Sequence, residues 1–286
     1  MKVAIATVST PSFVQGTQVL LSSFISSNTE LAYDLVIIGD NLPQVASSFL
    51  KFPQVKFHSV GDRLKKATQK VGEQNKLLRN KLAQFYSLEI FNLTGYDKVL
   101  FLDSDIVCQQ SITSFLSYQC DLGACYDRAW FMNKHRLYDS FYMVDPESSD
   151  TRERTMSPSY NSGVLLVDKV LINHPTYQEL IERIDSIDWT DTSGVNDQIV
   201  INQHFEGRIE TLPETYNYIT ERVGFDRKWS ESRADEACFI HFIGHPKPWN
   251  FKRIVKGLLK GRKAPENWSV WLKAYWKYLR MSTFRK

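Results

Sequence analysis

The amino-acid sequence predicts an α/β protein built on a mixed, mostly parallel sheet that is flanked by helices. Short runs of β-branched and aromatic residues alternate with longer stretches of helical periodicity, which is the order of βαβ units. The chain has 286 residues, enough for one large α/β domain, and its 43% hydrophobic and 23% charged residues match a folded soluble protein. Two carboxylates, Asp103 and Asp105, directly follow a strand-like run, where open α/β sheets bind ligands.

The strands and helices are placed by their residue patterns. Runs rich in Val, Ile, Leu or Phe and bounded by polar or glycine-containing turns predict strands. They cover residues 2–7, 34–39, 54–60, 98–102, 164–167 and 237–242. Apolar residues at helical spacing predict helices over 14–27, 43–51, 75–93, 174–185 and 196–204. The polar stretch at about 128–158 is expected to be a long loop, and residues 1–250 are expected to form one domain.

Residues 251–286 form a basic tail that differs from the rest of the chain. Eleven Lys and Arg side chains lie within 252–286 against one acidic residue, Glu266, which gives this segment a net charge of +10. The whole chain carries +3, so residues 1–251 carry −7. A mildly acidic body with a basic tail suggests that the tail contacts an anionic surface.

The same tail has an apolar stripe at helical spacing. The six residues at i, i+3, i+4, i+7, i+8 and i+11 are Trp268, Trp271, Leu272, Tyr275, Trp276 and Leu279. A basic helix with Trp on one face is typical of binding to anionic membrane lipid. The alternative is that the stripe packs on the body of the protein and the charges are solvated. Nucleic acid is not an expected partner, because the aromatic residues are not interleaved as stacking platforms.

The compartment is inferred from segments that the sequence lacks. No apolar run has the length of a membrane span or the pattern of a signal peptide. The four cysteines lack metal-type C-x-x-C spacing and are expected to be reduced core thiols. They are Cys108, Cys120, Cys125 and Cys238. We therefore expect a cytoplasmic protein, held peripherally on the inner face of the membrane by its tail.

The Asp103-Ser104-Asp105 tripeptide suggests a divalent-metal site. Two carboxylates released at the end of one strand can turn toward the same hard cation. Mg²⁺ or Mn²⁺ held in this way, with open coordination positions, commonly binds a diphosphate. D-x-D also occurs by chance in solvated turns, so the tripeptide alone leaves both interpretations open.

Four motifs in order resemble the signature of glycosyltransferase family 8, which includes glycogenin and the bacterial lipopolysaccharide galactosyl- and glucosyltransferases. They are Asp103-Ser104-Asp105, Asn161-Ser162-Gly163, Asn196-Asp197-Gln198 and His241-Phe-Ile-Gly244-His-Pro-Lys247-Pro-Trp249. The resemblance covers residues 1–250. It implies a GT-A fold with a Rossmann-like sheet, a nucleotide-sugar donor that is usually a UDP-sugar, Mn²⁺, and transfer with retention at the anomeric carbon.

By this resemblance, Asp103, Asp105 and His241 would ligate the metal. Two hard oxygens and one imidazole suit Mn²⁺, with Mg²⁺ as the alternative, better than Ca²⁺. The metal would neutralise charge on the UDP leaving group. Lys247 would add a fixed charge on the same diphosphate, and Gly244 would let the backbone approach a phosphate closely.

The turn after the first strand resembles the uridine-binding turn of the family. Thr7, Ser9 and Thr10 offer hydroxyl and backbone groups to the base edge. Phe13 stands where the family often has a Tyr that stacks on uracil, so the ring face is kept and the hydroxyl is lost. Ser104, within the D-x-D turn, is expected to contact the donor as well.

A second group is expected around the transferred sugar: Asn161, Ser162, Asp127, Asp197 and Gln198. Retention requires either a covalent glycosyl-enzyme or attack from the same face. Asp197 and Asp127 are the candidate nucleophiles for the first route. We expect the second, in which the departing phosphate oxygen takes the acceptor proton and Gln198 stabilises the cationic sugar through its amide oxygen.

Ser87 departs from the family pattern. The family usually has Lys or Arg at this position, where the base contacts the donor diphosphate and sugar. Lys76, Arg79 and Lys81 are nearby bases one to three helical turns earlier, and Lys81 is the expected substitute with a catalytic role. The sequence leaves the choice among the three open.

The expected activity is metal-dependent, retaining transfer of galactose or glucose from a UDP-sugar to a glycan or glycolipid, such as lipooligosaccharide or a surface polysaccharide. The loop at 128–158 would cover the acceptor. One alternative is a glycogenin-like enzyme that glucosylates itself or another protein, with Tyr138 and Tyr142 as candidate acceptors. Another is a catalytically weak nucleotide-sugar-binding protein. The three complete metal ligands favour an active enzyme, and the basic tail favours a lipid-linked acceptor.

Overall fold

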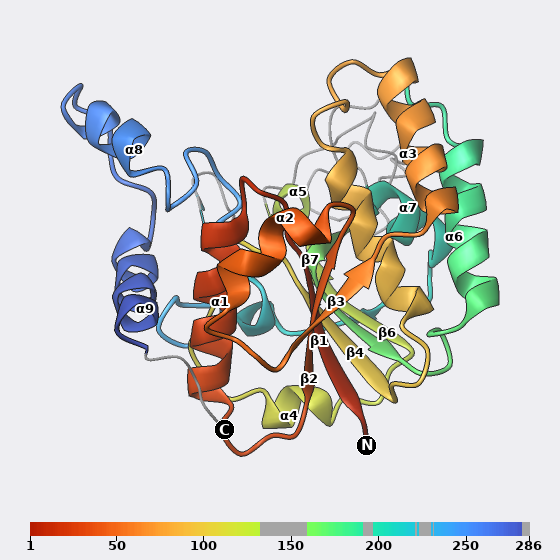
Figure 1. The fold of residues 1–286 in the computed structure, drawn as a ribbon, viewed down its shortest axis with the longest axis horizontal. Helices are drawn as coiled ribbons and strands as arrows, with labels where there is room; N and C mark the ends of the chain where they lie inside the picture. Colours follow the sequence, from red (N-terminus) through yellow and green to blue (C-terminus); the bar gives the residue numbers. More distant parts are fainter. Residues whose placement is uncertain (132–158, 191–196, 221, 223–229, 231, 282–286) are drawn as a thin grey trace, which may run out of the picture.

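The computed structural model describes residues 1–286 except 132–158, 191–196, 221, 223–229, 231 and 282–286 (Figure 1). In chain order its elements are β1 (Val3–Val8), α1 (Val14–Ser27), β2 (Asp34–Gly39), α2 (Leu42–Ala46), the 3₁₀ helix η1 (Ser47–Phe49), β3 (Val55–Ser59), α3 (Asp62–Gln74), the 3₁₀ helix η2 (Leu82–Asn92), β4 (Lys98–Leu102), β5 (Ile106–Cys108), α4 (Thr113–Leu116), β6 (Leu122–Tyr126), α5 (Arg128–Phe131), β7 (Tyr160–Asp168), α6 (His174–Ser186), α7 (Asp197–His204), β8 (Glu210–Thr211), the 3₁₀ helix η3 (Glu214–Tyr216), β9 (Tyr218–Ile219), β10 (Phe239–His241), α8 (Phe251–Leu258) and α9 (Trp268–Arg280).

The main sheet has seven strands in the order β3-β2-β1-β4-β7-β6-β8. The pairs β1–β2, β2–β3, β1–β4 and β6–β8 are parallel, whereas β7 is antiparallel to both β4 and β6. A second, three-stranded sheet has the order β5-β10-β9. The predicted mixed, mostly parallel sheet is therefore confirmed.

Helices cover both faces of the main sheet, so its central strands β1, β2, β4 and β7 are apolar on both sides. Along β1, Ala4 and Ala6 face a cluster shared with α3, η2, α6 and α7, whereas Val3 and Ile5 face α1. Figure 1 shows α3, α6 and α7 on one side of the sheet and α1 on the other. The ends of these strands, where the polar candidate residues follow, therefore lie between the helices of the two faces.

The predicted helix over 75–93 is wrong in extent and in type. The structure places α3 earlier, over Asp62–Gln74, and a 3₁₀ helix over Leu82–Asn92. Between them the Asn75 side chain donates to the Trp189 carbonyl at 2.8 Å and accepts from the Leu77 backbone N–H at 2.9 Å, which turns the chain. Residues 85–91 are all buried and therefore have no amphipathic period, so their pattern did not reveal where the helix begins.

The C-terminal helix α9 lies along α1, and α8 projects beyond it (Figure 1). Trp271 is 1% exposed and packs near Trp249, with ring centroids 6.2 Å apart, while Tyr278 stacks on Phe52. The expectation that the six-residue stripe forms one outward face is wrong. Its members span too wide an arc of the helix, so Trp271 faces the body while Trp276 stays 58% exposed. The domain boundary at residue 250 stays a prediction.

In the described part of the chain, no helix is long and apolar enough to cross a membrane. Cys108, Cys120, Cys125 and Cys238 are free thiols, and all but Cys120 are buried.

Candidate functional site

The D-x-D turn begins at the carboxyl end of β4, the central strand of the main sheet. The Asp103 backbone N–H donates to the Gly163 carbonyl of β7 at 2.8 Å. The Asp105 carbonyl accepts from the Phe242 N–H, just after β10, at 3.0 Å. These bonds fix the turn between both sheets, with the Asp105 side chain buried and the Asp103 side chain 43% exposed.

His241 joins the two carboxylates from the neighbouring strand β10, which pairs antiparallel with β5. Its Nε2 lies 3.2 Å from Asp105 Oδ1 and 3.5 Å from Asp103 Oδ2. Burial alone would lower the pKa of His241, but Asp105 and Asp103 together raise that pKa to about 9. The structure thus brings together the three predicted metal ligands, with one ligand atom of each within 4.8 Å of the others.

These residues fit a hard divalent cation. Two carboxylates and one imidazole are a donor set that Mn²⁺ accepts. Gly163 keeps the space beside them open, because a Cβ there would lie 2.3 Å from His241 Cε1 and 2.8 Å from Asp103 Oδ2. The requirement for glycine in the Asn161-Ser162-Gly163 motif is therefore steric.

Lys247 completes the charge balance of the cluster. Its Nζ donates to Asp105 Oδ2 at 2.5 Å and to the Phe242 carbonyl at 2.9 Å, and the side chain is buried. Burial opposes ionisation of Asp105, but Lys247 and His241 hold the pKa of that carboxyl well below its usual range. Lys247 was expected to contact the donor diphosphate. In this structure its ammonium group contacts Asp105, a predicted metal ligand.

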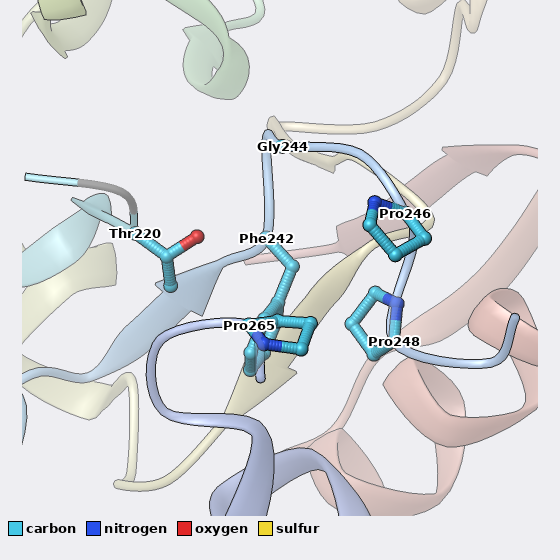
Figure 2. A pocket seen from close by; sticks show the side chains of 6 residues that line it. All are labelled: Thr220, Phe242, Gly244, Pro246, Pro248 and Pro265. Carbon is cyan, nitrogen blue, oxygen red and sulfur yellow. The ribbon is translucent and has the colours of Figure 1, made fainter. Parts of the chain in front are cut away.

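The loop that carries Gly244 and Lys247 is braced by the C-terminal region. Figure 2 shows Pro265, from the segment between α8 and α9, beside Phe242 and opposite Pro248, lining a small pocket. Trp268 Nε1 donates to the Pro248 carbonyl at 3.0 Å. The chain beyond residue 250 thus helps to shape the loop.

Hydroxyl groups from three segments meet under the D-x-D turn. Thr17 Oγ1, on α1, lies within hydrogen-bonding distance of Ser9 Oγ, at 2.9 Å, and of Ser104 Oγ, at 3.0 Å. Ser104 Oγ also lies 3.3 Å from Thr7 Oγ1 and donates to the Val8 carbonyl. Thr7, Ser9 and Ser104 are buried, so their hydroxyls hold the turn against α1. Their expected contacts with the nucleotide-sugar donor stay predictions.

The other two residues of this turn that are predicted to bind the nucleotide-sugar donor lie nearer the surface. Thr10 and Phe13 are partly exposed. The Phe13 ring meets Trp249 edge-on, with centroids 5.3 Å apart. Trp249 Nε1 donates to the Ser12 carbonyl at 3.2 Å, which ties this turn to the end of the His241–Trp249 motif.

On the sugar side, the structure joins three predicted residues by side-chain hydrogen bonds. Asn161 Nδ2 donates to Gln198 Oε1 at 3.2 Å, and Gln198 Nε2 donates to Asp127 Oδ2 at 3.1 Å. Asp127 also accepts from Ser159 Oγ at 2.8 Å and from the Trp130 N–H at 2.9 Å. Asp127 therefore accepts hydrogen bonds at both of its carboxylate oxygens.

Asp197 is buried at the start of α7, close to the predicted metal ligand Asp103. Burial, and then the negative charge of Asp103, raise the pKa of Asp197 to about 7, although hydrogen bonds from Ser87 and Ser162 act in the opposite direction. Ser87 Oγ donates to Asp197 Oδ2 at 2.7 Å. A neutral hydroxyl thus contacts the carboxylate from the position where the family usually has a base.

None of the three basic residues predicted to replace the family's base at position 87 belongs to the buried contact between Ser87 and Asp197. Lys76, Arg79 and Lys81 are exposed, and Lys81 precedes the first residue of η2. The catalytic role expected of Lys81 stays a prediction. Asn196, Tyr138, Tyr142 and residues 132–158 of the loop predicted at 128–158 lie outside the described residues. Its first four residues form the short helix α5, and the acceptor role of the loop stays a prediction.

Sequence reasoning missed Asn217, which is fully buried between η3 and β9. Its Oδ1 lies 3.0 Å from His241 Nδ1, and its Nδ2 donates to Asn161 Oδ1 at 2.8 Å. A single Asn before a two-residue strand carries no recognisable sequence signal. Its position depends on contacts between segments far apart in the chain.

The fold and the cluster at the strand ends together define a GT-A-type domain. The chain belongs to glycosyltransferase family 8, because the sequence model of that family, "Glycosyl transferase family 8", matches residues 4–253.

Similarity to individual proteins agrees with this family. The chain is 29% identical over 168 residues to a lipopolysaccharide 1,2-glucosyltransferase of Escherichia coli, a match that covers 54% of this chain and 45% of that protein. The crystal structure of the galactosyltransferase LgtC with donor and acceptor sugar analogues superposes with a TM-score of 0.62 at 18% identity, over 95% of this chain and 100% of that one. The glycosyltransferase GlyE of Streptococcus pneumoniae TIGR4 gives 0.60 at 15%, over 96% and 60%. Both structural matches concern the fold alone.

Proposed function

We propose that this protein is a metal-dependent, retaining hexosyltransferase that moves galactose or glucose from a UDP-sugar to a glycan or glycolipid, such as lipooligosaccharide or a surface polysaccharide. The observation that carries the proposal is the cluster of Asp103, Asp105 and His241 in a family 8 chain. The glucosyltransferase and galactosyltransferase names of the similar proteins support a hexose donor.

Asp103, Asp105 and His241 would hold Mn²⁺, with Mg²⁺ as the alternative. Bound there, the cation supplies positive charge to the diphosphate leaving group. Lys247 Nζ already lies on the Asp105 side of the cluster, so it would share its charge between that carboxylate and the diphosphate. Gly244, in the same loop, would leave room for a phosphate to approach the backbone.

On the sugar side, Gln198 is the residue that we assign to the developing cation. Its Nε2 is committed to Asp127, and its Oε1 accepts one hydrogen bond, from Asn161. An amide oxygen has two lone pairs, so the second can face the anomeric carbon. Asp127 accepts hydrogen bonds from Ser159, Trp130 and Gln198, and Asp197 is buried against Ser87. These contacts make both carboxylates poor nucleophiles and support same-face attack over a covalent intermediate.

A separate observation supports an anionic membrane surface as a partner, with the protein peripheral on its cytoplasmic side. Lys273, Trp276, Lys277 and Arg280 line an open hollow on the outer face of α9. Basic side chains around an exposed Trp are the combination that binds the headgroup region of anionic bilayers. This outward face replaces the six-residue stripe as the proposed contact.

The test is slow hydrolysis of a panel of UDP-sugars by the purified protein with Mn²⁺. We expect one UDP-hexose to be hydrolysed, activity to vanish in EDTA and return with Mn²⁺, and Asp103→Asn to remain inactive. Full activity in EDTA would contradict the metal-dependent assignment. Intact mass after incubation with the chosen donor tests the glycogenin-like alternative, because self-glucosylation adds successive hexose masses.

A further inference from the structure

Asn217 is a buried residue outside the predicted site that contacts both His241, a predicted metal ligand, and Asn161, on the sugar side. It follows η3 and precedes β9, which runs parallel to β10 and aligns Ile219 with His241. Its backbone N–H donates to the Glu214 carbonyl at 2.9 Å, and the residue is 0% exposed. The side-chain amide is therefore held in one place, between the imidazole of β10 and the amide of Asn161.

The amides around Asn217 form one continuous hydrogen-bonded chain. It runs from His241 Nδ1 to Asn217 Oδ1 (3.0 Å), from Asn217 Nδ2 to Asn161 Oδ1 (2.8 Å), from Asn161 Nδ2 to Gln198 Oε1 (3.2 Å) and from Gln198 Nε2 to Asp127 Oδ2 (3.1 Å). Each amide accepts on one side and donates on the other. The chain thus connects a metal ligand to a carboxylate on the sugar side.

The direction of this chain is fixed at Asn161. The Gly163 backbone N–H donates to Asn161 Oδ1 at 3.0 Å, and a backbone N–H only donates. The NH₂ group of Asn161 therefore faces Gln198, which turns its oxygen to Asn161 and its NH₂ group to Asp127. Asn161 must therefore keep its oxygen toward Gly163 and Asn217, and Asn217 must meet it with its NH₂ group.

This orientation leaves the Asn217 oxygen facing His241, so Nδ1 of the imidazole must carry a proton, and Nε2 points at Asp103 and Asp105. We propose that Asn217 is a positioning residue that selects this form of His241 for metal binding and couples it to Asn161 and Gln198. A metal-bound histidine commonly donates its second ring N–H to an oxygen in this way, which fixes the tautomer and the ring rotation. The inference rests on the proposed metal-dependent function.

Two substitutions separate the contacts of Asn217. Asn217→Ala removes both hydrogen bonds. Asn217→Asp keeps an acceptor for His241 Nδ1–H but has no NH₂ group for Asn161, whose oxygen it would repel. Asn28→Ala is the matched control, because Asn28 is another buried amide that binds backbone groups, the Phe24 carbonyl and the Ile112 N–H, outside the site.

The experiment measures Mn²⁺ affinity by titration calorimetry without donor, and then turnover of the UDP-sugar at saturating Mn²⁺. We expect Asn217→Ala to bind Mn²⁺ 10–100-fold more weakly than the wild type, the usual loss when the partner of a metal-bound histidine is removed. Asn217→Asp should bind Mn²⁺ at least as tightly as the wild type and yet turn over about tenfold more slowly or worse. Asn28→Ala should match the wild type in both measurements.

The outcomes distinguish this inference from the proposed function. If Asp103→Asn abolishes Mn²⁺ binding but Asn217→Ala binds as tightly as the wild type, Asn217 does not position His241 and the inference fails alone. If Asn217→Ala does not fold, Asn217→Asp decides, because weak Mn²⁺ binding or unimpaired turnover in that variant overturns the coupling. If the wild type binds Mn²⁺ no better than Asp103→Asn does, the proposed metal centre fails and the inference fails with it.

Discussion

Each charged residue among the predicted metal ligands has a partner of opposite sign in the structure. Asp105 lies between Lys247 and His241, and both partners are buried with it. Asp103 faces the same imidazole from a half-exposed position. The two aspartates would therefore act alike as metal ligands, but they differ in how much they should stabilise the fold when no metal is bound.

This difference predicts how the two Asp→Asn variants behave. Both Asp103→Asn and Asp105→Asn should abolish Mn²⁺-dependent turnover. Asp105→Asn should also lower the free energy of unfolding of the metal-free protein by about 3–5 kcal/mol, because it leaves Lys247 buried without its counter-charge. Asp103→Asn should change it by less than about 1 kcal/mol. Urea denaturation in EDTA checks both values, and equal destabilisation by the two variants would contradict the assigned burial.

Asp197 should give the metal-free protein a pH-dependent stability. Its pKa is about 7 in the folded state and 3.8 as the unperturbed value, so between these pH values the folded state keeps a proton that the unfolded chain has lost. The contribution of Asp197 to stability should therefore fall as pH rises from about 4 to 7, by on the order of 3 kcal/mol, and change little above pH 7. Asp197→Asn should lack this decline. Urea denaturation at a series of pH values checks this. The prediction is contradicted if the free energy of unfolding changes with pH in the same way in the wild type and in Asp197→Asn.

At the scale of single elements, α1 is the support of the D-x-D turn. A Cβ on Gly16 would lie 2.5 Å from the Ser104 carbonyl and 2.7 Å from the Trp249 ring. Thr17, one residue later, binds the hydroxyls beneath the same turn. The first turn of α1 is therefore in direct contact with the segment that carries the metal ligands.

Gly16→Ala should accordingly displace α1 from the turn. Overpacking of this kind costs about 1–3 kcal/mol of stability, and here it should also weaken Mn²⁺ binding, because the turn must shift. Gly95→Ala is a control for loss of a glycine, since Gly95 has φ +90° but no atom within 4 Å of a Cβ. That variant should lose stability through backbone strain while it binds Mn²⁺ normally. Unchanged Mn²⁺ affinity in Gly16→Ala would show that the turn does not depend on α1.

Elements were predictable from the sequence where one local pattern determines them. Strands β1, β2, β3, β4 and β7 of the main sheet read directly as apolar runs, whereas β6 and β8 were missed. The D-x-D pair was found because it follows such a run, and His241 because it begins the family motif that ends at Trp249. The 3₁₀ helix η2 was misread because its buried residues have no period. Asn217 and the contact of Ser87 with Asp197 were not predictable, because each is made by segments 24 and 110 residues apart in the chain.

At the scale of the whole molecule, the C-terminal helices are packed on the catalytic body and contact it at several points. Trp271 lies against Trp249, Trp268 binds the Pro248 carbonyl, and Met281 accepts a hydrogen bond from Ser22 on α1. The outer face of α9 is left to solvent. One helix therefore combines a structural face and a face available to a partner.

Two tryptophans of α9 should separate these roles. Trp271→Ala should cost about 3–5 kcal/mol of stability, because the side chain is fully buried. Trp276→Ala should change stability by less than about 0.5 kcal/mol, because Trp276 is exposed, and should reduce binding to anionic vesicles in a sedimentation assay. Vesicle binding that survives in Trp276→Ala and in a variant with Lys273, Lys277 and Arg280 replaced by Gln would contradict the proposed membrane contact.

The packing of α9 also has a consequence for proteolysis. Lys260, Arg262 and Lys263, between α8 and α9, are exposed trypsin sites, whereas Trp271 and Tyr278 anchor the following helix to the body. A chain cut at this linker should therefore keep its last helix bound without a covalent link. Trypsin under native conditions should give two bands on a denaturing gel but a single peak of unchanged size in gel filtration. Early release of the small fragment would show that the anchoring contacts are too weak to hold it.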